Sequence, residues 1–410
     1  MKDMSEAATL AIRGADVIFD GDVAAADVLI AGGKIVEIGD VGAADTTLDG
    51  RGQLLAPALV DIHGDAFERQ MMPRDGVYFP IDTAVLETDR QLAANGIATA
   101  YHAVTFSWEP GLRDVSRGAD LIQALHRNAP RLTVENRVQL RWETFALEAI
   151  DVIEEALKGP LLPSVAFNDH TSMTMRAFDV PVQERLFEQS PDFPLASFDD
   201  PRMRDRCTST AKRAGLGMDA YLDLFAKVWE RRGEIDAAIR RVAEAARAVG
   251  APMLSHDDTQ VETREYYRAI GATIAEFPMV LPVAEAARAA GDPIIFGAPN
   301  AVRGGSHIGS LGAGDMVEAG LCDGLASDYF YPAMLAAIDR LDREKRAPRP
   351  ALWSLVSKGP ARASGLDDRG EMAIGQRADL VLVDWPEGQT PAITATLSAG
   401  RLAYRAERHG

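Results

Sequence analysis

Eight strand-like runs alternate with helical runs along most of this chain. The strand-like runs begin near residues 57, 97, 137, 164, 252, 273, 293 and 323. Such alternation is typical of a parallel sheet whose strands are joined by crossover helices, and eight units predict a (β/α)8 TIM-like barrel over residues 56–364. A doubly wound sheet is the alternative fold, but no Gly-x-Gly-x-x-Gly turn follows the first strand.

The two ends of the chain have a different pattern. Residues 8–55 form short β segments separated by Gly-Gly and Asp-Gly pairs, which favour hairpin turns. Because β character returns near residue 370, we expect residues 1–55 and 365–410 to form one small composite β-sandwich domain. Within the barrel region, residues 171–217 lack clear periodicity and are long for a plain loop, which predicts a lid or an insertion over the site.

Charge and apolar content narrow the class of protein. The chain has 61 acidic and 43 basic residues, a net charge of −18, which argues against nucleic acid as a general partner but allows a small anionic substrate. No apolar run is long enough to span a membrane, and the first residues lack a signal-peptide pattern. With only two cysteines, we expect a cytoplasmic protein without disulfides.

Imidazole and carboxylate side chains follow several predicted strands. Barrel enzymes place their chemistry at these carboxyl ends, and His63 and Asp65, two residues apart in a strand, would point to the same side. The candidate metal ligands are His63, Asp65, Glu143, His170, His256 and Asp328. Nitrogen and oxygen ligands without sulfur predict a catalytic site for one or two divalent ions, with Zn favoured over Mn or Fe.

Several of these residues have simpler interpretations. His63 and Asp65 alone also fit a strand that ends in a polar loop. Glu143 can pair with Arg141 instead of a metal, and Asp328 can cap the helix that follows it or serve as the general base. We choose His170 and not Asp169 as the metal ligand, because consecutive strand residues face opposite sides and only one of the two can face the barrel centre.

A glycine-rich stretch at residues 297–307 predicts an anion site. Glycines let backbone N–H groups approach an anion, and the stretch ends with Arg303, Gly304, Gly305, Ser306 and His307. Arg69 and Arg74, just after the first metal motif, are expected to add to the same site. The alternative for the stretch is a flexible barrel loop.

The motifs together resemble a known group. They lie at residues 63–65, 68–74, 140–143, 168–171, 255–258, 297–307 and 327–329. With the composite small sheet and the final Asp328, they resemble the amidohydrolase superfamily, and more narrowly its family of diphosphatases that act on α-D-ribose 1-methylphosphonate 5-triphosphate in phosphonate degradation. The chain departs from that family at four positions near the expected site, Gly64, Ala66, Gln70 and Phe330.

The resemblance implies hydrolysis of a ribosyl 5-triphosphate to the 5-phosphate and pyrophosphate by metal-activated water. The six ligands would hold the metal, Asp328 would take the proton from water, and the arginines and the glycine-rich stretch would bind the polyphosphate. A homodimer is common among such barrels. The rival functions are hydrolysis of a C–N bond, by cyclic amide hydrolysis or deamination, and a non-catalytic binding protein that retains the barrel.

Overall fold

The computed structural model describes residues 8–306 and 309–406. Its larger part is an eight-stranded parallel sheet in the order β13-β12-β11-β10-β9-β8-β7-β6. A parallel bridge between Gly64 and Asp328 joins the first strand to the last and closes the sheet into a barrel, which confirms the predicted fold. The strands are β6 (Leu59–Gly64), β7 (Ile97–Phe106), β8 (Glu135–Glu143), β9 (Ser164–Asn168), β10 (Met253–His256), β11 (Ile274–Glu276), β12 (Ile294–Gly297) and β13 (Gly324–Ala326).

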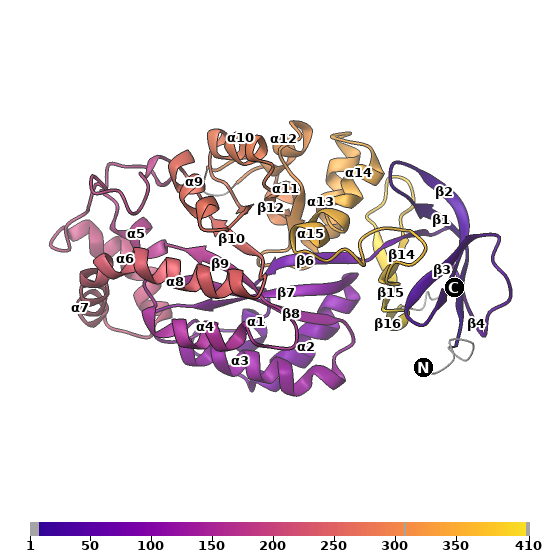
Figure 1. Ribbon diagram of the computed structural model, residues 1–410, viewed down its shortest axis with the longest axis horizontal. Coiled ribbons are helices and arrows are strands. Elements are labelled where there is room, and N and C mark those ends of the chain that lie inside the picture. The colour runs from indigo at the N-terminus through magenta and orange to yellow at the C-terminus, as the bar shows by residue number, and fades with distance from the viewer. Residues whose placement is uncertain (1–7, 307–308, 407–410) are drawn as a thin grey trace.

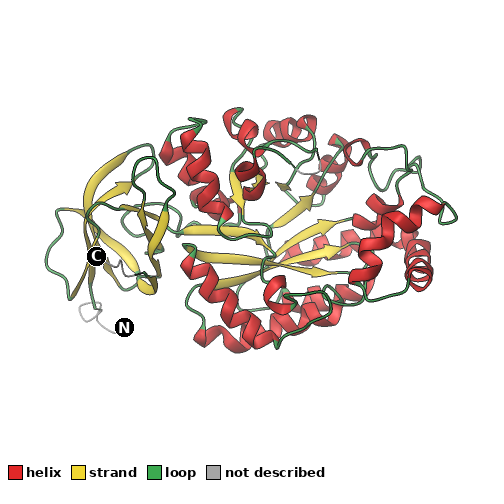
Figure 2. Ribbon diagram, turned by 180° about the vertical axis from the view of Figure 1, so that it is seen from behind, coloured by secondary structure: helices red, strands yellow, loops and turns green. Residues whose placement is uncertain are grey.

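Helices surround the barrel strands (Figure 2). Each outer helix buries one apolar stripe; in α8, for example, Ile235, Ile239, Val242 and Ala246 are buried at helical spacing. The helices are α1 (Glu68–Met71), α2 (Ile81–Ala94), α3 (Val115–Asn128), α4 (Ile150–Ala156), α5 (His170–Met175), α6 (Pro201–Arg213), α7 (Met218–Trp229), α8 (Ile235–Ala248), α9 (Val261–Ala269), α10 (Leu281–Ala290), α11 (Ala298–Arg303), α12 (Ala313–Glu318), α13 (Ala333–Arg343), α14 (Arg349–Ser354) and α15 (Lys358–Ala363).

The segment predicted as a lid or insertion contains helices of its own. Helix α6 begins after Asp200, whose side chain accepts the Arg202 N–H, and buries Met203, Cys207 and Ala211, which are four residues apart. This short apolar stripe is visible in the sequence but is hidden by the polar residues around it. Figure 1 shows α5, α6 and α7 at the end of the barrel opposite the small sheet.

Both ends of the chain build the small sheet. Its strand order is β16-β15-β14-β5-β1-β2-β3, with β4 paired to β1, so that C-terminal β14 lies antiparallel to N-terminal β5. The composite domain expected from the sequence is therefore one mixed sheet (Figure 1). Its strands are β1 (Leu10–Ile18), β2 (Val23–Ala31), β3 (Lys34–Gly39), β4 (Thr46–Asp49), β5 (Leu54–Pro57), β14 (Leu380–Asp384), β15 (Ala392–Ser398) and β16 (Arg401–Arg405).

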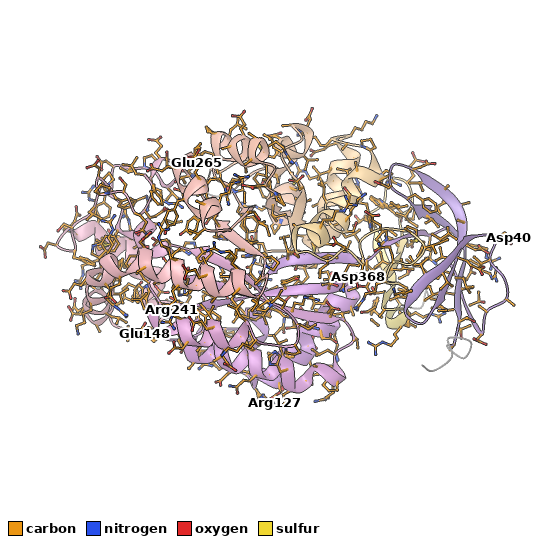
Figure 3. The ribbon with its side chains drawn as sticks, viewed as in Figure 1. Asp40, Arg127, Glu148, Arg241, Glu265 and Asp368 are labelled. Carbon is orange, nitrogen blue, oxygen red and sulfur yellow. The ribbon has the colours of Figure 1, made fainter. Side chains whose placement is uncertain are left out.

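Charged side chains cover the outer helices, where Figure 3 labels Arg127, Glu148 and Arg241. Arg127 of α3 pairs with Asp82 of α2, and Arg241 of α8 pairs with Glu154 of α4. Exposed pairs of this kind contribute little to stability but keep the surface polar. In the described part of the chain, no helix combines the length and the apolar character needed to cross a membrane.

Glu135 connects the barrel to the small domain. Its carboxylate lies 3.0 Å from Arg369 Nη1 and 2.7 Å from Arg377 Nη1, both of which precede β14, and its side chain is only 12% exposed. Burial alone would raise the pKa of Glu135, but Arg369 and the neighbouring arginines lower it below its ordinary value of 4.5. The ion cluster therefore favours the charged form in the folded protein.

We expect Glu135→Gln to lower the free energy of unfolding by about 2 kcal/mol at neutral pH, because hydrogen bonds to charged groups are lost. A depressed carboxyl pKa stabilises the fold above the ordinary pKa and loses that contribution as pH falls through the folded value. Denaturant titrations should therefore show the two proteins converging below pH 4.5. Glu154→Gln, at an exposed pair, is the matched control and should change little. A constant difference at all pH values would contradict the assignment.

Candidate active site

Eight ionisable side chains meet at the carboxyl ends of the barrel strands. They are His63, Asp65, Glu143, His170, His256, Asp257, Glu276 and Asp328. Three overlapping groups among them have ligand atoms within 4.8 Å of one another: His63, His256 and Glu276; His170, His256 and Asp257; and His63, Asp65 and Asp328. The structure thus brings the six ligands predicted from the sequence into one region and adds Asp257 and Glu276.

Glu276, at the end of β11, orients two histidines at once. Its Oε1 lies 3.0 Å from Nδ1 of His63 and its Oε2 lies 2.7 Å from Nδ1 of His256, and all three side chains are buried. Gln139 Nε2 also donates to Glu276 Oε1 at 2.8 Å. Burial lowers the pKa of His63, but the carboxylate of Glu276 outweighs burial and raises it overall.

The arrangement leaves the Nε2 atoms of these histidines facing the site. His63 Nε2 is buried and has no hydrogen-bond partner among the described residues. Buried polar atoms are nearly always satisfied, and a histidine that binds a metal commonly donates its other ring N–H to a carboxylate. The donor set and this orphaned nitrogen therefore fit a divalent metal.

Glu143 and His170 form the second half of the cluster. Nδ1 of His170 lies 2.6 Å from Glu143 Oε1, and the backbone N–H of His170 donates to Oε2 at 3.1 Å. Burial opposes ionisation of Glu143, but His170 and Arg141 lower its pKa to about 2. Asp257 adds a carboxylate oxygen 3.7 Å from His170 Nε2 and 3.5 Å from His256 Nε2. The neighbour of His170, Asp169, instead caps α5 by accepting the Ser172 N–H.

Asp328 occupies an unusual backbone position after β13. Its φ angle is 55°, in the left-handed region that Asp and Asn tolerate better than most residues. The N–H of Asp328 donates to the His63 carbonyl, and the Asp65 N–H donates to the Asp328 carbonyl, each at 2.9 Å. Burial, together with the nearby charge of Asp65, raises the pKa of Asp328 to about 6. Helix α13 begins later, at Ala333, so Asp328 does not cap it.

The structure explains why a glycine, Gly64, stands between His63 and Asp65. A Cβ at this position would lie 2.6 Å from Asp61 Oδ2 and 3.0 Å from Ser327 Oγ. Buried Asp61 accepts hydrogen bonds from the N–H and the hydroxyl of Ser327, at 3.0 and 2.6 Å, and so ties the first strand to the last. Gly64 therefore accommodates this internal brace.

Arg141 lies at the centre of the cluster, two residues before Glu143 on β8. Its Nη1 donates to Asp65 Oδ2 at 3.3 Å, its Nε donates to Asn168 Oδ1 at 3.2 Å, and its Nη2 lies 3.4 Å from His256 Nε2. No hydrogen bond between Arg141 and Glu143 is found among the described residues, because Glu143 is taken by His170. Arg141 lines two cavities, both of which reach the cluster.

The first cavity, of about 240 Å³, is here called the arginine-loop cavity because Arg303, Gly305 and Ser306 line it together with His63, His256 and Asp328. The glycine-rich stretch thus begins as helix α11 and then borders the site. Gly304 ends α11 with φ 77° and is not among the lining residues, since it packs against Arg340. His307 lies outside the described residues.

The two other predicted arginines lie away from this cavity. Arg69 is exposed, with its guanidinium 6.0 Å from the Tyr329 ring, and Arg74 is exposed in a turn closed by Val77. Their roles as substrate ligands stay predictions. Among the other departures from the family pattern, Ala66 is buried and Gln70 bonds to Gln91, while Phe330 is 46% exposed. 

The second cavity, of about 320 Å³, is here called the hydroxyl cavity. Its lining includes Thr105, Ser107, Trp108, Thr174, Thr210 and Tyr221. The residues come from the end of β7 and the loop after it, from α5, and from α6 and α7. The cavity also reaches Arg141, Glu143 and His170, so that it opens on the same cluster as the arginine-loop cavity.

Two residues of the cluster, Glu276 and Asp257, were not predicted from the sequence. Glu276 ends a short apolar strand, and a charged residue in that position is the same signal that identified Glu143. Asp257 directly follows His256, but its left-handed φ of 58° turns its side chain back toward the histidines, which alternation along a strand does not predict.

Comparison with known proteins agrees with this fold. No protein-family model matches the chain. The chain is 33% identical over 347 residues to the α-D-ribose 1-methylphosphonate 5-triphosphate diphosphatase of Escherichia coli (strain K12), covering 82% of this chain and 84% of that protein. Two solved structures share the fold: dihydropyrimidinase from Brevibacillus agri (TM-score 0.56, 15% identity, 97% and 95% of the two chains) and a zinc-bound adenosine deaminase from Xanthomonas campestris (TM-score 0.60, 13% identity, 96% and 92%).

The identity and coverage of the first comparison establish the family, and the solved structures establish the fold. The chain is therefore a hydrolase that belongs to the family of the Escherichia coli diphosphatase, and it shares its fold with dihydropyrimidinase and adenosine deaminase.

Proposed function

We propose that this hydrolase is a metal-dependent diphosphatase that converts a ribosyl 5-triphosphate, α-D-ribose 1-methylphosphonate 5-triphosphate or a close analogue, to the 5-phosphate and pyrophosphate. The observation that carries the proposal is the direct opening of the histidine and carboxylate cluster into a cavity bordered by Arg303, Gly305 and Ser306. Guanidinium groups and glycine-rich backbone suit a polyphosphate. The name of the Escherichia coli relative supports the same substrate.

One or two divalent ions, with Zn favoured and Mn or Fe also compatible, would be held by His63, Asp65, Glu143, His170, His256 and Asp328. When bound, such an ion lowers the pKa of water and neutralises charge on phosphoryl oxygens. The buried Nε2 of His63, which has no hydrogen-bond partner within residues 8–306 and 309–406, supports this assignment. Asp257 is a further carboxylate in reach of the same histidines.

Side chains of the protein accept the proton of the attacking water, stabilise the charge on the attacked phosphoryl group and bind the leaving group. Asp328 accepts the proton of the attacking water, because its raised pKa suits a general base near neutral pH. Arg141 donates to the oxygens of the attacked phosphorus, where negative charge builds up as the water oxygen bonds and the bond to pyrophosphate breaks. Arg303 and the N–H groups of the glycine-rich stretch hold the departing pyrophosphate.

The test is to incubate the metal-loaded protein with a ribosyl 5-triphosphate, ideally the 1-methylphosphonate, and to follow products by phosphorus NMR with and without chelator. Chelator-sensitive release of pyrophosphate is the expected result. Release of orthophosphate alone, or no phosphorus chemistry from protein shown to contain metal, would overturn the proposal and direct attention to C–N bonds.

Glu276→Gln should weaken metal binding by about 10-fold to 100-fold, the usual cost of losing a carboxylate that orients a histidine ligand. His63 and His256 each contact a different oxygen of Glu276, and in glutamine one of those oxygens becomes an NH2 group that presents a donor to an Nδ1–H. Chelator competition measures the affinity. Asp89→Asn is the matched control, since Asp89 is also buried and hydrogen-bonded, but in the described part of the chain its hydrogen bonds go to Thr133, Val134 and Asn136 and to no histidine. Equal metal affinity in wild type and Glu276→Gln would remove Glu276 from the site.

A further inference from the structure

The two cavities beside the cluster differ in the hydrogen bonds that they offer. The arginine-loop cavity presents donors, through Arg303 and Arg141 and the backbone of the glycine-rich stretch. Arg141 lines both cavities and pairs with Asp65; the two other arginines of the hydroxyl cavity, Arg113 and Arg213, are each paired with a glutamate. Arg113 forms two hydrogen bonds to Glu68, at 2.7 and 2.8 Å, and Arg213 pairs with Glu109 at 3.1 Å.

The threonines of the hydroxyl cavity present oxygen acceptors. Thr174 Oγ1 donates its proton to the His170 carbonyl at 2.8 Å, and Thr210 Oγ1 donates to the Cys207 carbonyl at 2.9 Å. A hydroxyl has one proton and two acceptor lone pairs. With the protons used inside the protein, these oxygens keep lone pairs that accept from a ligand with O–H groups, and Thr210 in addition bonds to the Tyr221 hydroxyl. An ionised polyphosphate has no such donors.

Thr105 gives a second, independent sign of a ligand. Its side chain is 5% exposed, it lines the hydroxyl cavity, and its Oγ1 has no hydrogen-bond partner among the described residues. A buried hydroxyl without a partner destabilises the fold, and a valine would fill the same volume without that cost. A ligand in the hydroxyl cavity would supply the missing partner if the Thr105 side chain rotates to expose Oγ1, which is covered in this structure.

The wall behind these hydroxyls is rigid. The Trp108 ring stacks on Phe225 of α7, with centroids 5.4 Å apart and planes 20° apart, and its Nε1 donates to Thr171 Oγ1 at 2.9 Å. Tyr221 of α7 donates to Glu109 at 2.6 Å. Polar hydroxyls beside fixed aromatic rings suit a small polyhydroxylated ring.

We infer that the hydroxyl cavity is the subsite for the sugar end of the substrate, a pentose whose hydroxyls donate to Thr105, Thr174 and Thr210. The inference rests on the proposed function. It orients the substrate: the pentose lies in the hydroxyl cavity, the pyrophosphate portion lies in the arginine-loop cavity, and the bond that breaks lies beside Arg141, which lines both.

This orientation gives the inserted segment a role. Thr174 belongs to α5 and Thr210 to α6, both within the segment that lacks periodicity in the sequence. These two helices, with α7, line the hydroxyl cavity, whereas the glycine-rich stretch lines the arginine-loop cavity. The insertion thus determines which organic group the enzyme accepts, whereas the loop after β12 recognises the phosphates common to many substrates.

The two products provide a test that does not depend on turnover. Calorimetry on the metal-loaded enzyme measures separately the binding of pyrophosphate and of ribose 5-phosphate, which stands in for the sugar product because it has the same sugar and 5-phosphate but lacks the 1-methylphosphonate. Thr105→Val with Thr210→Val should weaken ribose 5-phosphate by about 10-fold or more, since each lost hydrogen bond costs about fivefold to tenfold, and should leave pyrophosphate within about twofold. Arg303→Met should do the opposite. Thr105→Val alone should also keep or raise the melting temperature.

Thr208→Val is the matched control, because Thr208 lies on the exposed face of α6 and bonds only to the Arg204 carbonyl. The inference is overturned if the threonine variants weaken both products equally, or if ribose 5-phosphate responds to Arg303→Met alone. Failure of the proposed function looks different: wild type would then bind neither product, or would bind both and release no pyrophosphate from the triphosphate.

Discussion

Asp328→Asn is expected to lower kcat by about 10³-fold while metal content is retained, because general-base catalysis contributes roughly 10²–10⁴-fold. An amide does not accept the proton of the attacking water at neutral pH. Asparagine tolerates the left-handed backbone at this position, where φ is 55°, so the chain should keep its path. Steady-state release of pyrophosphate gives kcat, and elemental analysis gives the metal content of the same preparations.

The same strand offers the control for this variant. Asp323 lies at the opposite end of β13, where it accepts hydrogen bonds from Arg288 and from the Ile294 N–H. Asp323→Asn should therefore affect stability and leave kcat near the wild-type value. Substantial turnover by Asp328→Asn would remove Asp328 from the role of base, and loss of metal in that variant would make it primarily a ligand.

Arg141→Met is expected to lower kcat by about 10²-fold to 10³-fold, the usual loss when one donor to a developing charge is removed. The change in KM should be smaller, because Arg303 and the glycine-rich stretch would still bind the phosphates. Arg141→Lys should recover only part of the rate, since an ammonium group lacks the planar fork that contacts two oxygens. Added guanidinium should partly restore turnover by the methionine variant.

Arg137 is the matched control for Arg141, because it lies on the same strand β8 but at the other end, paired with Glu135 at 2.6 Å. Arg137→Met should reduce stability and leave kcat and KM almost unchanged. If Arg141→Met instead raises KM with kcat intact, Arg141 binds substrate equally in the ground state and the transition state, and its proposed role would be wrong.

The barrel was predictable from the sequence because its strands are short apolar runs with clear punctuation. The strand ends also identified His63, His256 and Asp328, since a polar side chain after an apolar run stands out. The role of Glu276 was not predictable in this way: nothing in its own strand shows that two histidines from other strands converge on its carboxylate. Contacts of this kind depend on closure of the barrel.

The hydroxyl cavity was hidden for a different reason. Thr105, Thr174 and Thr210 are ordinary residues at unremarkable positions, and their common surface arises only when α5 and α6 pack beside β7. Arg141 was visible as a charge two residues before Glu143, but its contacts with Asp65 and His256 come from strands far away in sequence. Long-range packing of polar groups has no periodic signature.

The pairing of β5 with β14 has a consequence for folding of the chain during its synthesis. Leu380 lies opposite Pro57, so the edge of the N-terminal sheet at β5 stays open in the nascent chain until β14 (Leu380–Asp384) has left the ribosome. Unpaired edges recruit other chains, and contacts between distant segments form slowly. Synthesis that stops before residue 380 should therefore leave an aggregation-prone fragment. Once β14 has been made, it pairs with β5 and covers the open edge.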